Sequence, residues 1–273
     1  MHRHHQEAPP LGNPLSSINT SLNIMPAYGL MRHESGLWSI KPTLYQTTKG
    51  DIAMPRKQDL IQVLYKLKPE ELAECLSPCG ELAQYLISVA ASDYAKKSEL
   101  TPEISRYFIH LFLAVATEIG GEMVYMPYSP SKIHRFADTL TSFVLNGTFS
   151  LDAIRKFGVY TETQKDSGHL YLWLQRIEVI VDVMREESQQ FQVGEKTKYN
   201  IIFTFFSGFL LSLSGRAQYF PRGCALVSML KRKGICMDFT GDNIYPLTRK
   251  YKISTSMVYF YLKEDREKRR KSW

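Results

Sequence analysis

The sequence predicts a mainly α-helical protein made of two similar units, each with several helices and one short β-strand. Two observations lead to this prediction. Apolar residues recur at three- and four-residue spacing from Pro55 onward, which is the period of helices that bury one face. A pattern near residue 121 also returns 94 residues later without a gap, and a fixed period of this size indicates a repeated structural unit.

The first stretch of the chain, residues 1–53, shows no such period. It contains five prolines and many Ser, Thr, Asn and Gln residues, a composition typical of a flexible arm. Helical spacing then begins, with Leu60, Val63 and Leu64 on one face. Pro69 is expected to start the next helix, because proline is favoured in a first helical turn.

The remaining elements are arranged in order along two units. The first unit is assigned to residues 54–168, with further helices at 82–94, 103–118, 131–145, 151–157 and 161–167 and a strand at 122–126. The second unit is divided into residues 169–223 and 224–273. Its helices are expected at 170–188, 196–214, 225–239, 244–251 and 255–270, and its strand at 216–220.

The repeat itself is carried by three short motifs in each unit. The first copy has Gly121 to Pro127, then Asn146-Gly147, then Arg155 to Val159; the second has Gly215 to Pro221, then Thr240-Gly241, then Arg249 to Ile253. We expect the strands around Tyr125 and Tyr219 to pair as an antiparallel ribbon. The apolar helices at 107–115 and 201–213 would then be buried against each other, as an intrachain pseudo-dimer.

Charge and composition narrow the class of partner. The 273-residue chain has a formal charge of +7, and residues 222–273 alone hold 13 Lys/Arg and 5 Asp/Glu. Such a basic end favours an acidic partner such as nucleic acid. The apolar segment from Ile201 to Leu213 is too short to span a bilayer, which needs about 20 residues, so no membrane partner is predicted.

The sequence also gives no indication of an enzyme. It contains no glycine-rich phosphate loop, no paired carboxylates at a pocket-like spacing and no nucleophile with its base. No cofactor and no metal are predicted; Cys75 and Cys79, one helical turn apart, are interpreted as buried thiols rather than zinc ligands. The four cysteines form no CxxC pair and suit the reducing cytoplasm.

Residues 242–263 carry the strongest functional pattern. A helix-turn-helix needs two short helices that cross over a tight turn with an apolar plug. Leu247 and Tyr251 are expected to face the core, and Ile253 to be the plug. Lys252 occupies the turn position where glycine is usual, at a cost of about 1 kcal/mol if the backbone is left-handed there.

The second helix of this pattern has an inner and an outer face. Val258, Tyr261 and Leu262 are expected to face inward, and Ser254 or Thr255 to cap the helix, as Asn243 caps the helix before it. Outer side chains near the start of such a helix meet base edges, and later basic ones meet phosphates. The predicted DNA-binding residues are Arg222, Asn243, Arg249, Lys250, Ser254, Thr255, Ser256, Tyr259, Lys263, Arg266, Arg269 and Arg270. The alternative is an ordinary helical hairpin with a basic end.

Several of these motifs resemble the Mor/C family of phage and mobile-element transcription activators. The resemblance rests on Tyr219 to Arg222, Phe239 to Asn243, Leu247 to Ser254 and Val258-Tyr259. It implies a dimerisation region with a short strand in residues 169–223 and a DNA-binding helix-turn-helix in residues 224–273. It also implies an activator of a phage, plasmid or integrative element that binds double-stranded promoter DNA in the cytoplasm and recruits RNA polymerase.

The first copy departs from this template. Ile154 occupies the place of a small residue, and Gln164 the place of an apolar anchor. A buried unpaired glutamine costs about 1–3 kcal/mol, so a degenerate helix-turn-helix without base contacts is expected there. Any second DNA-reading helix-turn-helix, or reading head, would then come from a second copy of the chain or from a different activator subunit. The competing hypothesis is a non-catalytic interaction or assembly subunit that kept the fold and binds a partner protein.

Overall fold

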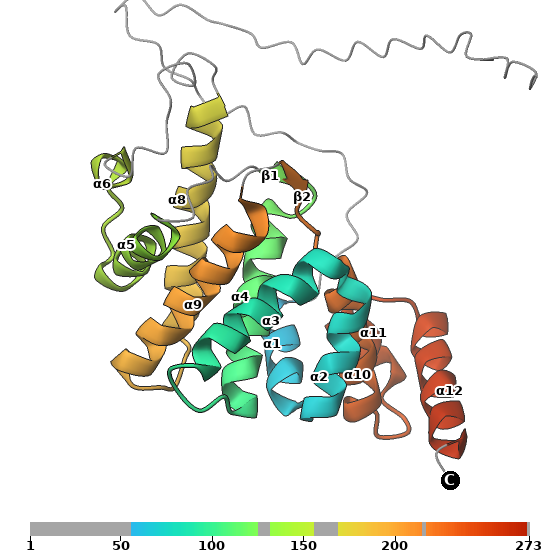
Figure 1. The fold of residues 1–273 in the computed structure, drawn as a ribbon. Coiled ribbons are helices and arrows are strands. Elements are labelled where there is room, and N and C mark those ends of the chain that lie inside the picture. Colours follow the sequence, from blue (N-terminus) through green and yellow to red (C-terminus); the bar gives the residue numbers. More distant parts are fainter. Residues whose placement is uncertain (1–55, 125–131, 156–168, 215–216, 272–273) are drawn as a thin grey trace, which may run out of the picture. The chain divides into compact units, whose positions relative to one another are not determined.

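A computed structural model describes residues 56–124, 132–155, 169–214 and 217–271 of the chain. They are mainly helical with one two-stranded sheet (Figure 1), which confirms the predicted fold class. The arm expected at 1–53 and the helix expected at 161–167 lie outside the described residues. In the described part, no helix combines the length and the hydropathy needed to cross a membrane.

The first helices are α1 (Lys57–Lys66) and α2 (Pro69–Leu76), followed by the 3-10 turn η1 (Ser77–Cys79). The face of α1 predicted from spacing is buried, with Leu64 fully so. Pro69 takes the first position of α2, and the Lys68 backbone N–H donates to Glu71 Oε2 at 3.0 Å. The start of α2 is therefore fixed both by proline and by a side-chain acceptor for a free N–H.

Four helices form the centre of the core: α3 (Glu81–Ala95), α4 (Pro102–Ile119), α8 (His169–Ser188) and α9 (Glu195–Leu213). Helix α3 packs against α9, and α4 packs against α8 (Figure 1). Helices α4 and α9 contact each other as well, and their phenylalanines Phe108, Phe112, Phe205 and Phe209 are fully buried. The prediction that these two apolar helices form a shared core is confirmed. Each such side chain stabilises the fold by about 1.5–3 kcal/mol relative to exposure.

The two strands, β1 (Met123–Val124) and β2 (Gln218–Tyr219), form an antiparallel pair. Met123 lies opposite Tyr219, and Val124 lies opposite Gln218. The Phe220 backbone N–H extends the ladder by donating to the Glu122 carbonyl at 2.9 Å. The predicted pairing is thus confirmed. Among the described residues, β1 begins one residue later than expected and β2 ends one residue earlier, and Tyr125 lies outside the described residues.

The register of this ribbon is related to the 94-residue offset. Val124 and Gln218 are 94 residues apart, and they are direct partners in the ribbon. The same offset moves the bounds of α4 to 196–213, within one residue of α9, and places α3 at 175–189, largely within α8. The contacts of α3 with α9 and of α4 with α8 are therefore reciprocal under the offset.

The helices that come after each strand pack differently. Helix α5 (Ile133–Asn146) lies against α8 and α9, and α6 (Leu151–Arg155) comes next. Helix α10 (Cys224–Asp238) instead contacts α1, α2 and η1, and leads to α11 (Ile244–Tyr251) and α12 (Thr255–Lys271). The reciprocal arrangement of the core helices is therefore not continued by α5 and α10.

Candidate nucleic-acid interface

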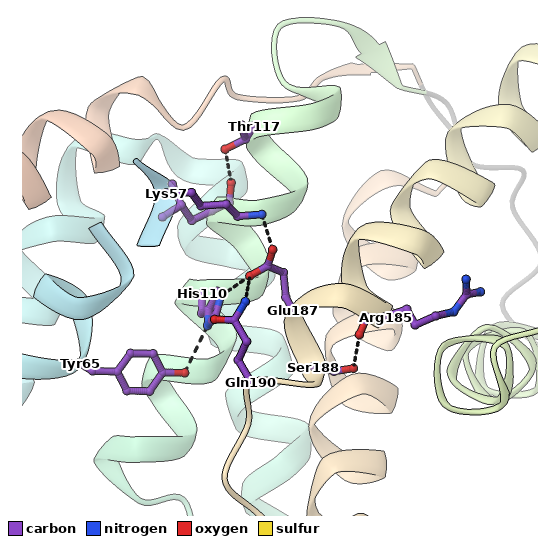
Figure 2. Close-up of polar contacts among 9 residues, drawn as sticks. Lys57, Tyr65, His110, Thr117, Arg185, Glu187, Ser188 and Gln190 are labelled. Atoms are coloured by element: carbon purple, nitrogen blue, oxygen red, sulfur yellow. Dashed lines mark hydrogen bonds and ion pairs between the residues drawn. The ribbon is translucent and has the colours of Figure 1, made fainter. Parts of the chain in front are cut away.

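A buried polar cluster fixes α1 to the core (Figure 2). His110 of α4 is fully buried, and its Nε2 lies 2.7 Å from Glu187 Oε2 of α8. The other oxygen of Glu187 pairs with the Lys57 ammonium of α1. The Tyr65 hydroxyl, also on α1, lies 3.2 Å from His110 Nδ1. The cluster therefore joins one helix of the amino-terminal part to two core helices.

The carboxylate of Glu187 is the centre of this cluster. Burial by itself raises the pKa of Glu187, but the hydrogen bonds from His110 and Lys57 and the Lys57 charge outweigh it. The net result is a pKa below the usual value of a glutamate. Because Glu187 stays ionised, it provides a charge partner for Lys57 and an acceptor for His110.

Helix α1, once fixed, supports α10, which in turn supports the two last helices. The Lys233 ammonium on α10 lies 2.9 Å from Glu71 Oε1 and 3.0 Å from Glu74 Oε2, both on α2. Burial raises the pKa of Glu71, but the hydrogen bond from the Lys68 backbone N–H and the contacts with Lys233 outweigh it, so that this pKa is lowered. The pKa of Glu74 is lowered mainly by its hydrogen bond with Lys233 and by the Lys233 charge. The position of α10 is thus set by residues far away in the sequence.

We refer to α11, the turn Lys252–Ser254 and α12 as the C-terminal helix pair. Its inner face is apolar as predicted, with Leu247, Tyr251, Val258 and Leu262 buried and Ile253 packed against the core. Tyr251 rests on Gly234 of α10, where an added Cβ would lie 2.3 Å from the tyrosine Oη. Glycine is therefore required at residue 234 for the ring to reach this position.

A second small cluster holds Tyr251 in place. Its hydroxyl donates to Asp238 Oδ2 at 2.8 Å, and the Lys250 ammonium lies 2.7 Å from the same oxygen. Burial raises the pKa of Asp238, but the bonds from Lys250 and Tyr251 outweigh it and the pKa is lowered. Burial and, to a smaller extent, the same contact raise the pKa of the Tyr251 hydroxyl.

The turn has the backbone expected from the sequence. Lys252 is left-handed, with φ 51° and ψ 55°, and is the non-glycine residue with positive φ among the described ones. The Ile253 N–H donates to the Thr248 carbonyl at 3.2 Å, which closes the end of α11. The predicted strain at Lys252 is therefore present.

The two predicted caps have different outcomes. Ser254 Oγ accepts a hydrogen bond from the Met257 N–H at 3.3 Å and so caps α12. Ser254 and Thr255 were the two residues predicted for this cap. Asn243 precedes α11 but its side chain does not cap that helix, so this prediction was wrong. Its amide instead donates to the Asp238 carbonyl at 2.7 Å and accepts from the Thr240 N–H at 3.0 Å. The short α10–α11 loop offers these closer partners.

The predicted DNA-contacting residues divide into two groups. Six are on the outside of the helix pair, with Thr255 half-buried and the others exposed: Arg249, Thr255, Ser256, Tyr259, Lys263 and Arg266. Arg270 is also exposed, near the end of α12. The Lys263 ammonium is 4.0 Å from Glu267, a distance that contributes little in water.

Other predicted residues already have protein partners, among them Ser254, whose Oγ accepts from the Met257 N–H. Lys250 is paired with Asp238, and Asn243 is bound within the loop. Arg269 is 2.7 Å from Asp265 on the same helix. Arg222 precedes α10 at the end far from α11, where its side chain lies over Gly121. The structure therefore does not bring Arg222 next to the start of α12.

Two exposed apolar residues of α12 were absent from the prediction. Phe260 is 50 % exposed and Met257 is 38 % exposed. Phe260 is two residues from both Val258 and Leu262, which places it about 200° around the helix from each. Helical spacing alone could have identified this position, because both inward residues were predicted.

The fold and this surface define a class: a mainly helical protein with a two-stranded ribbon and a cationic, solvent-facing C-terminal helix. More particularly, residues 173–272 match the model of the Mor transcription activator family. The match extends from within α8 to the end of α12, and confirms the predicted resemblance for this part of the chain. No curated protein and no solved structure matches the chain.

Proposed function

We propose that the protein is a DNA-binding transcription activator whose C-terminal helix pair is a helix-turn-helix. One observation carries this proposal: α12 buries Val258 and Leu262 while Ser256, Tyr259 and Lys263 lie exposed along its outer side. A recognition helix needs this division between anchored and free faces to enter the major groove. The family match at residues 173–272 supports the same function.

The resemblance to the family also supports a proposal on the context and further partners of this function. We propose that the protein belongs to a phage, plasmid or integrative element, acts in the cytoplasm at promoter DNA, and recruits RNA polymerase. The basic side chains Arg249, Lys263, Arg266 and Arg270 would bind phosphates, whereas Thr255, Ser256 and Tyr259 would face bases. Arg269 would reach a phosphate by exchanging its Asp265 partner, because exposed ion pairs are weak.

We expect the full chain to select a preferred sequence from a randomised duplex pool and to bind it with strong salt dependence. With the five phosphate contacts proposed above, the logarithmic slope of affinity against salt is about −4.5. The double variant Lys263→Ala/Tyr259→Ala should lose the preference and have a shallower slope. Titrations at several salt concentrations measure both quantities.

Lys96→Ala is the matched control for this experiment, since Lys96 is an exposed lysine at the end of α3. It should leave sequence preference unchanged. Equal, weak binding of the wild type to every duplex would contradict the proposal. That outcome would favour the second candidate function, a non-catalytic assembly subunit that binds a partner protein.

We also propose that the chain is a tandem duplication that forms a pseudo-dimer with one intact reading head. The 94-residue relation between the paired strands and the reciprocal contacts of α3 with α9 and α4 with α8 support this origin. The contact that would join two separate units is then made within one chain. Ile154 is fully buried at a position where the helix-turn-helix template needs a small residue, which supports a degenerate first head.

A protein of this kind is expected to be monomeric and to bind DNA with a single chain. Light scattering of the free protein and of its complex should give one chain in each, and the protected DNA should hold one half-site, about one helical turn. A stable dimer on a palindrome with two equal half-sites would contradict the single-head proposal. It would leave the DNA-binding proposal intact, since binding itself is measured separately.

A further inference from the structure

One side of α12 faces away from the core, and we call it the outer line of the helix. It carries an apolar side chain between two polar ones. Ser256, Phe260 and Lys263 succeed one another at four- and three-residue spacing, so they lie on one side of the helix. This side is opposite the buried Val258 and Leu262. Phe260 therefore projects from the part of the helix that is farthest from the core.

Within the described part of the chain, Phe260 has no core-packing role that would explain an aromatic residue at this position. Half of its surface is exposed, and its ring is tilted against Tyr261, with centroids 5.9 Å apart. Tyr261 is itself half-buried and packed against the core. Phe260 is thus held from behind by an anchored ring while its own face remains in solvent.

The surroundings of Phe260 favour nucleic acid over a protein partner. Lys263 lies one turn further along, and Arg266 and Arg270 continue the exposed cationic side. Ser254 and Ser256 hydroxyls lie 3.1 Å apart at the start of the helix. A protein-docking surface is poor in charge at its centre, whereas here Phe260 and its exposed neighbours Met257 and Tyr259 lie among hydroxyl and cationic groups.

In the major groove, the apolar group of a base pair is the C5 methyl of thymine. We propose that Phe260 is a specificity-determining residue that packs against a thymine methyl and selects a T·A pair; this inference rests on the proposed DNA-binding function. Phe260 is in the second turn of α12, the part of a recognition helix that reaches base edges. The preceding Ser256 and the following Lys263 then meet neighbouring bases or phosphates.

Glu267 limits the extent of the reading surface. It continues the outer line one turn after Lys263 and is exposed, with its Oε1 4.0 Å from the Lys263 ammonium. A carboxylate at this position repels phosphates and does not pair with thymine. The part of α12 that is proposed to read bases accordingly ends before Glu267.

The test replaces each thymine of the preferred duplex in turn by deoxyuridine, which lacks only the methyl group. For the wild type, one replacement should weaken binding about fourfold to tenfold, the scale of burying one methyl group in an apolar contact. For Phe260→Ala the same replacement should have no effect. Phe260→Leu, which keeps an apolar side chain, should retain part of the discrimination.

Two controls distinguish this inference from the function on which it rests. Met257→Ala should keep the thymine effect, because Met257 lies to one side of the outer line. Thermal unfolding of the variants checks folding, which an exposed side chain should leave unchanged. Two outcomes would overturn the thymine proposal and leave the DNA-binding proposal intact. In one, the wild type selects a sequence but no deoxyuridine replacement weakens its binding. In the other, Phe260→Ala discriminates between thymine and deoxyuridine as the wild type does. If the wild type selects no sequence, the proposed function fails with it.

Discussion

Replacing Glu187 by alanine is expected to lower the free energy of unfolding by about 1–3 kcal/mol, the usual cost of leaving a buried polar group without its hydrogen-bond partner. The variant leaves His110, which is fully buried, without its acceptor, and leaves Lys57 without its charge partner. Because Lys57 belongs to α1, the attachment of α1 to the core should weaken most. Chemical denaturation of wild type and variant measures the difference.

The pH dependence of stability should change in the same variant. The pKa of Glu187 is lower in the folded protein than its usual value, so the unfolded chain binds this proton first as the pH falls. The stability that Glu187 contributes is therefore complete above the usual glutamate pKa and is lost as the pH falls through the lower folded pKa. Glu187→Ala should reduce the acid sensitivity of unfolding.

Glu195→Ala is a suitable control, since Glu195 is solvent-exposed and pairs with Lys198 on the same helix. Its effect should be less than about 1 kcal/mol. An equal loss of stability in both variants would contradict a special role for the buried cluster. So would an unchanged acid dependence in Glu187→Ala.

Replacing Gly234 by alanine is expected to displace the C-terminal helix pair and to abolish sequence-specific DNA binding. The new Cβ would lie 2.3 Å from Tyr251 Oη and 2.7 Å from two ring carbons, and such overpacking costs about 1–3 kcal/mol. Tyr251 is fully buried and bound to Asp238, so its ring cannot move aside without breaking these contacts. DNA titration and thermal unfolding measure the two effects.

Glycines elsewhere provide a graded comparison. An added Cβ at Gly194 meets nothing within 4 Å, and one at Gly208 lies 3.0 Å from the Leu86 carbonyl. Gly194→Ala should therefore be close to neutral and Gly208→Ala intermediate in stability. Tyr251→Leu in the Gly234→Ala background should recover part of the loss, because it removes the ring atoms that clash. A fully stable Gly234→Ala variant with normal DNA binding would show that the ring contact is unimportant.

Much of the fold could be predicted because its signals are local. The apolar period of residues 103–118 and 196–214 identified α4 and α9 to within one residue at each end. The position of Lys252 within the turn pattern identified the left-handed residue that the structure has. The inward direction of Val258 and Leu262 also followed from spacing. In each case the physical constraint acts between residues a few positions apart.

The docking of α10, the buried cluster around Glu187 and the loop before α11 depend on contacts that form only in the folded chain. A single sequence does not show such contacts. Nothing near Lys233 indicates that it pairs with Glu71 and Glu74, 162 and 159 residues away. His110 lies in an apolar run, and its partner Glu187 is on another helix. Asn243 was expected to cap α11, but the competing acceptor, the Asp238 carbonyl, is available only once the loop has folded.

The docking of α10 on α1 and α2 has a consequence for how the protein folds. The segment matched by the family model, residues 173–272, contains α9, whose fully buried Phe205 and Phe209 lie in a core shared with α3 and α4. It also contains α10, whose supports lie in the earliest described helices. The segment that matches the family model therefore does not contain all the contacts that support its helices in this chain. Contacts of such high sequence separation require the closure of long loops, so we expect the proposed reading head to take its final place after the core has assembled.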